Sequence, residues 1–387
     1  MILLRNGMIV SMDTAPFIGD VLIKSGKIEA MGKELAFPNA RISDCTGKYI
    51  LPGLIDAHCH IGMWEDGMGD EGADGNESTD PITPQMRAVD GVNPFDPCFT
   101  EAREAGITTV ATGPGSANVI GGQFAALKTV GRSVKEMTVL APLAMKAALG
   151  ENPKTVYTEQ KEAPHTRMAI AALFRGAMVE AQEYGKKLRQ GQEDEEKLPE
   201  RDLALEALLE VVERKLPVKI HAHRADDILT AFRLAEEFNL RISIEHCTEG
   251  HLIADHLKEL VDQTGAGIIV GPLLSERPKI EMKNLSLKAP CTLYEAGIPF
   301  ALMTDHPAVP IHHLLLCAAL CVREGLPEKI ALEAVTINAA RVLGLENRIG
   351  SIAPGKDADI AVFNGHPLDI RSKCVCTIIN GKIVHAI

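Results

Sequence analysis

The middle of the chain alternates short apolar runs with segments whose apolar positions have helical spacing. An apolar run with no polar alternation is typical of a strand that is covered on both faces. Strands that alternate with helices indicate a parallel sheet. The predicted strands are Ile107–Ala111, Thr138–Pro142, Val218–His221, Arg241–Glu245, Gly267–Val270 and Phe300–Met303. The predicted helices include Leu203–Lys215, Ile228–Phe238 and Pro327–Leu343.

The length of this region fits an α/β fold of the (β/α)₈ TIM-like barrel type. Residues 54–345 number 292, against about 250 residues in a typical barrel of this kind. Two segments are expected to be insertions. Gly62–Pro97 is rich in Gly, Asp and Pro and is predicted to be a long loop, whereas Glu183–Glu200 is strongly charged and is predicted to be an exposed helical extension.

Both ends of the chain have the pattern of short strands joined by tight turns. Ser25-Gly26 and Asn380-Gly381 each lie between β-branched runs, which predicts two hairpins. Because a single hairpin is barely stable, the two ends are expected to pack together. We therefore predict a small composite β-sandwich domain from residues 1–53 and 346–387, attached to a catalytic barrel of residues 54–345.

Composition narrows the class of partner. Aromatic residues make up 4% of the chain and the formal net charge is −12, which argues against nucleic acid or an anionic membrane surface as a partner. The nine cysteines form no C-x-x-C pair, and neither a signal peptide nor a membrane-spanning run is evident. A cytoplasmic protein that acts on a small molecule is expected, with homo-oligomer formation left open.

Histidines gather at the ends of the predicted strands. Six of the thirteen histidines follow four apolar runs, in the patterns His58-Cys-His60, His221-Ala-His223, Glu245-His246 and Asp305-His306. Two residues apart on a strand, both imidazoles lie on one face. Neutral imidazoles with a carboxylate are the ligand set of zinc and related metals. The pattern therefore predicts a metal site at the C-terminal ends of the strands.

The chain resembles the amidohydrolase superfamily, and within it the branch related to imidazolonepropionase. The matching segments are ILPGLIDAHCHIG, GGQFAALK, MKAALGENPK, GIPFALMTDHP and TINAARVLGLENRIGSIAPGKDADIAVF. Together they extend over nearly the whole chain. The resemblance implies a (β/α)₈ barrel whose termini build a composite β-sandwich, and a metal-dependent hydrolase that cleaves an amide-type C–N bond.

The resemblance also implies a ligand set for one or two divalent ions, most simply two zinc ions, with manganese, iron and nickel left open. The implied ligands are His58, His60, Lys146, His221, His246 and Asp305. Lys146 matches a lysine that reacts with CO₂ to form an anionic carbamate bridging two metals. The alternative for Lys146 is an ion pair with a substrate carboxylate or with Glu151.

Two residues are assigned catalytic roles. Asp305 is expected to take a proton from the attacking water and pass it to the leaving nitrogen. His223 is expected to hold the carbonyl oxygen or the oxyanion, its alternative being a supporting or packing role. His306 is expected to point away from the metal, and Cys59 and Cys247 are expected to be core residues.

Five further residues are weaker candidates for binding substrate: Gln123, Lys128, His165, Arg167 and His251. The first two follow the glycine-rich turn Gly113–Gly122, which lacks the ending of a phosphate-binding loop. His165 and Arg167 begin a predicted helix, where they could bind a substrate carboxylate. An exposed helix start explains their position equally well. His251 is the preferred residue to support His246, ahead of Glu245 and Glu249.

Two other functions use the same sequence features. A deaminase of the superfamily has a glutamate two residues after the fifth-strand histidine, where this chain has His223. A non-catalytic scaffold would have lost ligands, whereas this chain retains every expected ligand type. The possible substrates are cyclic amides, N-acyl amino acids and dipeptides. The pocket loops decide among these classes, and the shape of such loops cannot be inferred from one sequence.

Overall fold

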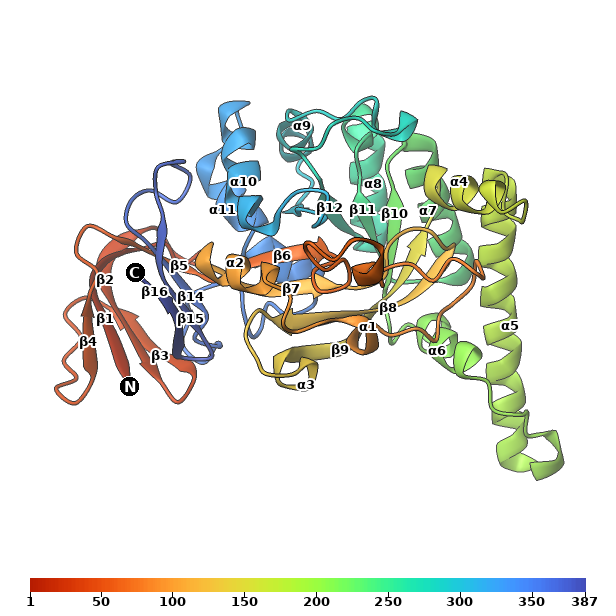
Figure 1. Cartoon of the computed structure of the whole chain (residues 1–387), viewed down its shortest axis with the longest axis horizontal. Coiled ribbons are helices and arrows are strands. Elements are labelled where there is room, and N and C mark those ends of the chain that lie inside the picture. The colour runs from red at the N-terminus through yellow and green to blue at the C-terminus, as the bar shows by residue number, and fades with distance from the viewer.

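Two eight-stranded sheets organise the chain, one from its middle and one from its two ends (Figure 1). The computed structural model describes residues 1–387. The strands of the middle sheet are, in spatial order, β6 (Leu54–Cys59), β7 (Ile107–Thr112), β8 (Ile120–Lys128), β9 (Thr138–Ala148), β10 (Val218–Ala222), β11 (Ile242–His246), β12 (Gly267–Val270) and β13 (Ala301–Leu302). The helices are α1 (Ala88–Gly91), α2 (Cys98–Glu104), α3 (Val134–Met137), α4 (Glu151–Glu159), α5 (Arg167–Glu193), α6 (Leu203–Val212), α7 (Ala225–Phe238), α8 (Ala254–Thr264), α9 (Ala289–Glu295), α10 (Leu314–Arg323), α11 (Glu328–Ala334) and α12 (Ile337–Val342).

The middle sheet is barrel-like but departs from eight parallel strands at one position. Strand β8 runs antiparallel to both β7 and β9, while the remaining neighbours pair in parallel. The four-residue α3 is the only helix between β7 and β9, so this part of the barrel lacks the βα repeat that we predicted. An antiparallel neighbour can follow through a short turn, whereas a parallel one needs a long crossover.

The two edge strands of the barrel sheet meet through hydrogen bonds beyond β13. The backbone N–H of Asp305 donates to the carbonyl of His58 over 3.2 Å, and that of His60 donates to His306 over 2.8 Å. Asp56 adds a side-chain link, since it accepts a hydrogen bond from the backbone N–H of Thr304 over 3.2 Å. These contacts bring residues nearly 250 positions apart to the same rim.

Asp56 gives the fold a pH-dependent stability. Burial raises the pKa of this carboxyl to about 7, against the hydrogen bonds from Thr304 and His58 that lower it. The folded protein keeps a proton that the unfolded chain releases above its ordinary pKa, so stability falls as pH rises from about 4 to about 7, by roughly 4 kcal/mol in total. In chelator-treated protein, Asp56→Asn should therefore gain stability over the wild type as pH rises. Denaturant unfolding at pH 5 and pH 8 measures the difference in unfolding free energy between Asp56→Asn and the wild type. An equal difference at the two pH values would contradict the prediction.

Strand β9 is longer than its sequence pattern indicated. It continues past Pro142 because residues 143–148, which are apolar except for Lys146, are buried, and residues 145–147 pair with both β8 and β10. Lys146 consequently lies within the strand, whereas we had expected it several residues beyond.

Both predicted insertions are present. Residues 62–97 contain only the 3₁₀ turn η1 (Gly69–Gly72) and the short α1, as expected of a long loop. The charged segment 183–200 forms the end of α5 and the turn η2 (Glu195–Lys197), which projects away from the barrel in Figure 1. The other 3₁₀ turns are η3 (Gly250–Ile253), η4 (Ile280–Met282) and η5 (Ile311–His313).

The terminal sheet joins strands from both ends of the chain, and both termini lie on it (Figure 1). Its strands are β1 (Ile2–Ile9), β2 (Phe17–Lys24), β3 (Lys27–Gly32), β4 (Arg41–Asp44), β5 (Tyr49–Pro52), β14 (Ile360–Phe363), β15 (Cys374–Ile379) and β16 (Lys382–Ala386). Both predicted hairpins form, and Asn380 and Gly381 have the positive φ angles of 50° and 73° that a type I′ turn requires.

The terminal strands form one continuous sheet instead of the two sheets of a sandwich. A register shift between Leu4 and Gly7 lets the first half of β1 pair with β4 and its second half with β5. The sheet encloses its own core of 12 buried residues drawn from both ends of the chain. All nine cysteines are free thiols. No helix combines the length and apolar character needed to cross a lipid bilayer.

Candidate active site

Two groups of potential metal ligands lie at the C-terminal ends of the barrel strands. One group is His58, His60 and Asp305, and the other is His221, His223 and His246. Within each group the ligand atoms all lie within 4.8 Å of one another. The structure thus brings together side chains from β6, β10, β11 and the segment after β13, as the sequence pattern predicted.

In the first group, both imidazoles direct Nε2 toward Asp305. The Asp305 Oδ1 atom lies 3.3 Å from His60 Nε2 and 3.7 Å from His58 Nε2. The opposite ring nitrogens are held in place: His58 Nδ1 donates to Glu245 Oε2 over 2.7 Å, and His60 Nδ1 donates to the carbonyl of Gly113 over 2.7 Å. With Nδ1 carrying the proton, each Nε2 has a lone pair for a metal ion.

The second group is anchored in the same way. His221 Nδ1 hydrogen-bonds Ser116 Oγ over 2.9 Å, and His223 Nδ1 hydrogen-bonds Thr248 Oγ1 over 2.7 Å. His246 Nδ1 donates to the carbonyl of Gly271 over 3.0 Å. The Nε2 atom of His246 is buried and has no hydrogen-bond partner. A buried nitrogen without a partner is costly, and a bound metal ion would satisfy it.

The protonation states favour cation binding. Burial lowers the pKa values of His58, His221, His223 and His246 well below the ordinary value, so these rings are neutral at pH 7. Burial raises the pKa of Asp305, but its contact with His60 and the nearby positive charges outweigh that effect, and the net pKa is lowered. Neutral imidazoles beside a carboxylate fit zinc and its neighbours.

Lys146 lies beside the first group with its side chain fully buried. Its Nζ is 3.3 Å from His58 Nε2, and no carboxylate lies within 4.0 Å of it. Burial lowers the pKa of this amine to about 8. The alternative partner Glu151 instead accepts from the backbone N–H of Glu281 over 3.0 Å, so the pairing of Lys146 with Glu151 does not form.

The backbone is strained where two of these side chains leave their strands. His246 and Asp305 have positive φ angles of 73° and 55°. Non-glycine residues seldom adopt this conformation, and when they do they cluster at functional sites. The sharp turn lets each strand end while its last side chain faces the centre of the barrel.

A cavity of about 200 Å³ is lined by members of both ligand groups: His60 and Asp305 from the first, and all three histidines of the second. Its remaining lining includes Trp64 and Asn76 from the long loop, together with Asn152 and Lys279. The Trp64 ring packs edge-on against His60 at a centroid distance of 5.0 Å. The loop of residues 62–97 therefore forms one wall of the cavity, which limits ligand size.

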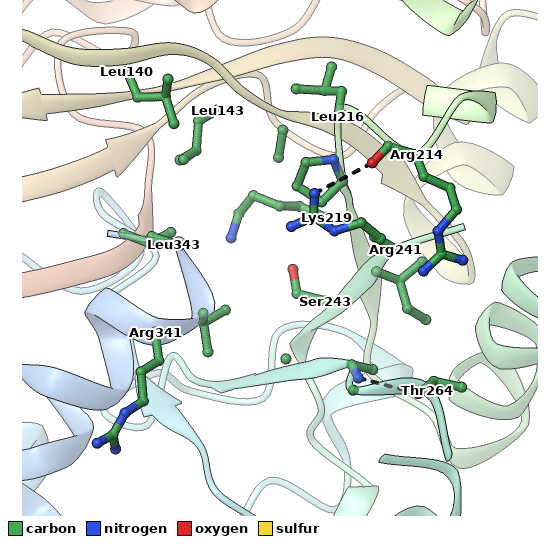
Figure 2. A pocket seen from close by; sticks show the side chains of 18 of the residues that line it. Leu140, Leu143, Arg214, Leu216, Lys219, Arg241, Ser243, Thr264, Arg341 and Leu343 are labelled. Atoms are coloured by element: carbon green, nitrogen blue, oxygen red, sulfur yellow. Dashed lines mark hydrogen bonds between the residues drawn. The ribbon is translucent and has the colours of Figure 1, made fainter. Parts of the chain in front are cut away.

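A second cavity, of about 580 Å³, lies at the opposite ends of the strands (Figure 2). Arg214, Arg241 and Arg341 line it, and its lining includes no histidine or carboxylate. Lys219 and Ser243 border this cavity, and both contact Glu245, the partner of His58. The ligand groups and this cavity therefore lie on opposite sides of the barrel interior.

None of the five weaker substrate-binding candidates lines the 200 Å³ cavity. Lys128 is buried in an ion pair with Asp359, and this pair ties β8 to the terminal sheet. Because β8 runs antiparallel, it ends at the far side of the barrel from the ligand groups. Arg167 is paired with Asp227, its Nε lying 2.8 Å from the carboxylate. These two cations are occupied by structural partners, so the structure does not support their predicted role.

The other three candidates also point elsewhere. Gln123 donates to the carbonyl of Pro84 over 3.1 Å, and His165 is exposed ahead of α5. His251 Nδ1 contacts the carbonyl of Thr248 over 2.9 Å. The side chain of the same threonine hydrogen-bonds His223. We predicted that His251, ahead of Glu245 and Glu249, supports His246. In the structure His246 Nδ1 donates to the carbonyl of Gly271 instead, and Glu245 contacts His58.

The remaining side-chain predictions hold in part. Cys59 and Cys247 are buried core residues whose pKa values are raised by burial, that of Cys247 to about 12, so both remain thiols. His306 belongs to neither ligand group, and neither of its ring nitrogens has a partner. The sequence missed Glu281, whose carboxylate lies 3.5 Å from His221 Nε2. This glutamate belongs to a loop segment without periodicity, so no sequence signal marked it.

Glu245→Gln should weaken metal binding. Its carboxylate accepts from His58 Nδ1 and from Lys219 Nζ, over 2.7 and 3.0 Å. A neutral amide holds the imidazole less firmly, and loss of such a partner lowers metal affinity by roughly 10–100-fold. Competition against a chelating dye measures the change. Glu249→Gln is the matched control, since Glu249 is also buried but contacts Ala225 and Asn284; equal affinities for the two variants would contradict the prediction.

A barrel that gathers five buried imidazoles and an aspartate at one end has the architecture of a metal-dependent hydrolase. Comparison with known proteins agrees. The sequence pattern of the Amidohydrolase family matches residues 49–384, and the chain belongs to this family. It is a metal-dependent hydrolase that acts on carbon–nitrogen bonds.

Three relatives illustrate the range of similarity. The amidohydrolase tasK of Hapsidospora irregularis is 31% identical over 94% of this chain, but the match spans only 40% of that longer protein. An imidazolonepropionase of Colwellia psychrerythraea is 25% identical over 89% of this chain and 85% of its own length. The crystal structure of an amidohydrolase from Thermotoga maritima has a TM-score of 0.97 and 43% identity, with 100% of both chains covered.

Proposed function

We propose that the protein hydrolyses an amide-type C–N bond in a small molecule: a cyclic amide, an N-acyl amino acid or a dipeptide. The observation that carries this proposal is the convergence of two ligand groups on a single cavity of about 200 Å³, which five of their six side chains line. The imidazolonepropionase of Colwellia psychrerythraea makes cyclic amides the first class to test.

The chain offers ligands for two divalent ions, for which zinc is our first choice. His58, His60 and Asp305 would hold one ion, and His221 and His246 the other. Lys146, after reaction with CO₂, would be the anionic bridge between them; its burial beside His58 without a carboxylate partner supports this assignment. When bound, such ions lower the pKa of water and polarise the substrate carbonyl.

Two side chains then perform the proton transfer and orient the substrate. Asp305 takes the proton from the attacking water and delivers it to the leaving nitrogen. Its lowered pKa keeps the carboxylate ionised and ready to accept that proton. His223 offers its Nε2 edge to the carbonyl oxygen, with Thr248 fixing the orientation of the ring. Trp64 from the long loop lines the cavity and packs against His60.

A screen of the zinc-loaded protein tests the proposal. Cyclic ureides and lactams, N-acyl amino acids and dipeptides should be presented separately, with the formation of a new carboxylate and amine (on one product molecule for the cyclic substrates) as the readout. Adenosine derivatives and other heterocyclic amines form the deaminase arm, scored by ammonia release. Turnover confined to the deaminase arm, or no stoichiometric metal after purification, would overturn the proposal.

A further inference from the structure

We propose that Lys279 binds a carboxylate group of the substrate. This inference rests on the proposed function and narrows it to amides that carry a free carboxylate: N-acyl amino acids, dipeptides with a free C-terminus, and lactams with a carboxyl substituent. Neutral amides and ureides of the same shape would be poor substrates. Lys279 lies in the loop between β12 and η4.

Lys279 is the only charged residue in the wall of the 200 Å³ cavity apart from the two ligand groups. The other polar residues of the wall are uncharged, namely Asn76, Ser116, Asn152 and Ser275. One cation among neutral hydrogen-bonding groups fixes the orientation of a small anionic ligand. Because the chain has a formal net charge of −12, the protein as a whole repels an anion, which needs such a local cation to bind.

The ammonium group of Lys279 has no partner within the protein. No carboxylate lies within 4.0 Å of its Nζ atom, and this atom makes no hydrogen bond. The side chain is partly buried. The two cations that we predicted to bind substrate differ in this respect, since Lys128 is paired with Asp359 and Arg167 with Asp227. Of these three basic residues, only Lys279 lines the cavity and keeps its charge uncompensated.

A single ammonium group suits a carboxylate better than a phosphate. Sites for phosphate usually add an arginine fork or a nest of backbone N–H groups, and no arginine lines this cavity. Its volume of about 200 Å³ is also small, against roughly 300–1,000 Å³ for most ligand pockets. The carboxylate and the scissile amide would therefore be only a few bonds apart, as they are in an acylated amino acid.

Reciprocal hydrogen bonds fix the wall that carries Lys279. The backbone N–H of Glu151 donates to Glu281 Oε2 over 2.9 Å, and that of Glu281 donates to Glu151 Oε2 over 3.0 Å. Gly150 permits this contact, because its φ is 89° and a Cβ there would lie 2.8 Å from Glu281 Oε2. The start of α4 is thereby tied to η4. Asn152 and Lys279, which adjoin the tied residues, are presented to the same cavity.

Matched substrate pairs test the proposal. Each pair is a carboxylate and its primary carboxamide, beginning with N-acetyl-L-alanine, alanylglycine and 5-oxo-L-proline and extending to the best substrate of the screen. The zinc-loaded wild type should prefer the carboxylate in kcat/KM by about 10–100-fold. Lys279→Met should raise KM for the carboxylates by a similar factor with little change in kcat, because the contact contributes to binding throughout the reaction. It should leave the carboxamides unchanged.

Two further variants are the controls. Lys279→Arg keeps the charge and should retain most of the preference for carboxylates. Lys283→Met should behave as wild type, because Lys283 lies just after η4 but is exposed and does not line the cavity.

Fluorescence gives a readout that is independent of turnover. Trp64 is the only tryptophan of the chain and lines the cavity. In the Asp305→Asn background, in which turnover is slow, titration with the same pairs gives the Kd of each ligand from the change in Trp64 emission. Adding Lys279→Met should raise the Kd of the carboxylates by about 10–100-fold and leave that of the carboxamides unchanged.

Three results would show that Lys279 does not bind a substrate carboxylate, although the proposed function would stand. The wild type could hydrolyse both members of a pair equally well, Lys279→Met could keep the wild-type preference or lose both activities equally, or the best substrate of the screen could carry no carboxylate. If the zinc-loaded wild type hydrolyses no amide of any class, the proposed function fails and this inference fails with it.

Discussion

Asp305→Asn should lower turnover by roughly 10³-fold or more while the protein stays folded. The carboxylate is the only acidic group in its ligand group, and it lies within 3.7 Å of both His58 and His60. Asparagine has nearly the same shape and tolerates the positive φ of 55° at this position. It cannot accept the proton from water, however. Steady-state kinetics on the best substrate from the screen, with circular dichroism to verify folding, measure the effect.

The matched control is Asp20→Asn. Asp20 is a buried aspartate of the terminal sheet whose carboxylate accepts from the backbone N–H groups of Asn6 and Leu35, each over 2.9 Å. This variant should keep wild-type turnover even where its stability is lower. Wild-type turnover in Asp305→Asn would show that the proton moves through another group.

Lys146→Ala should lower turnover by roughly 10²–10³-fold, because the variant lacks the anionic group that the carbamate supplies. The carbamate forms when the neutral amine nitrogen attacks the carbon of CO₂ and then releases a proton. The space left by the lysine is bordered by His58 and Phe124. A short carboxylic acid such as acetate or propionate should restore part of the activity by occupying that space.

The same assignment predicts a pH dependence in the wild type. Only the neutral amine reacts with CO₂, and the pKa of Lys146 is lowered to about 8. After CO₂ and metal are stripped at low pH, reactivation by zinc and bicarbonate should accelerate as pH rises through about 8. Full activity in CO₂-free buffer, together with no response of Lys146→Ala to added carboxylic acids, would exclude the carbamate.

Local pattern determined much of what the sequence predicted correctly. The hairpin at Asn380-Gly381 follows from backbone preferences of two adjacent residues. The ligand histidines were identifiable because the period of a strand places His58 and His60 on one face. The ends of neighbouring barrel strands lie at one rim, so separate motifs converge without any knowledge of the loops. Family resemblance added Lys146, which has no signal of its own.

Other features depend on contacts between distant segments and therefore required the tertiary structure. The direction of β8 was not predictable, because an apolar strand reads the same in either orientation. We predicted Lys128 as a pocket residue because it follows the glycine-rich turn Gly113–Gly122, whereas β8 carries it to Asp359. Glu245 lies 187 positions from His58, and its contact depends on how β6 and β11 face each other across the barrel.

The sequence by itself determined the alternation of strands and helices, the association of both ends in one small domain, and the histidine and aspartate residues of the two ligand groups. These features arise from residue spacing and turn preferences, which act over a few positions. Only the tertiary structure decided which group orients each imidazole, which cations are already paired, and that Glu281 lies within 3.5 Å of His221. Those outcomes depend on burial and on distances between remote segments, and a buried charge or ring nitrogen acquires its role only from the neighbours that folding gives it.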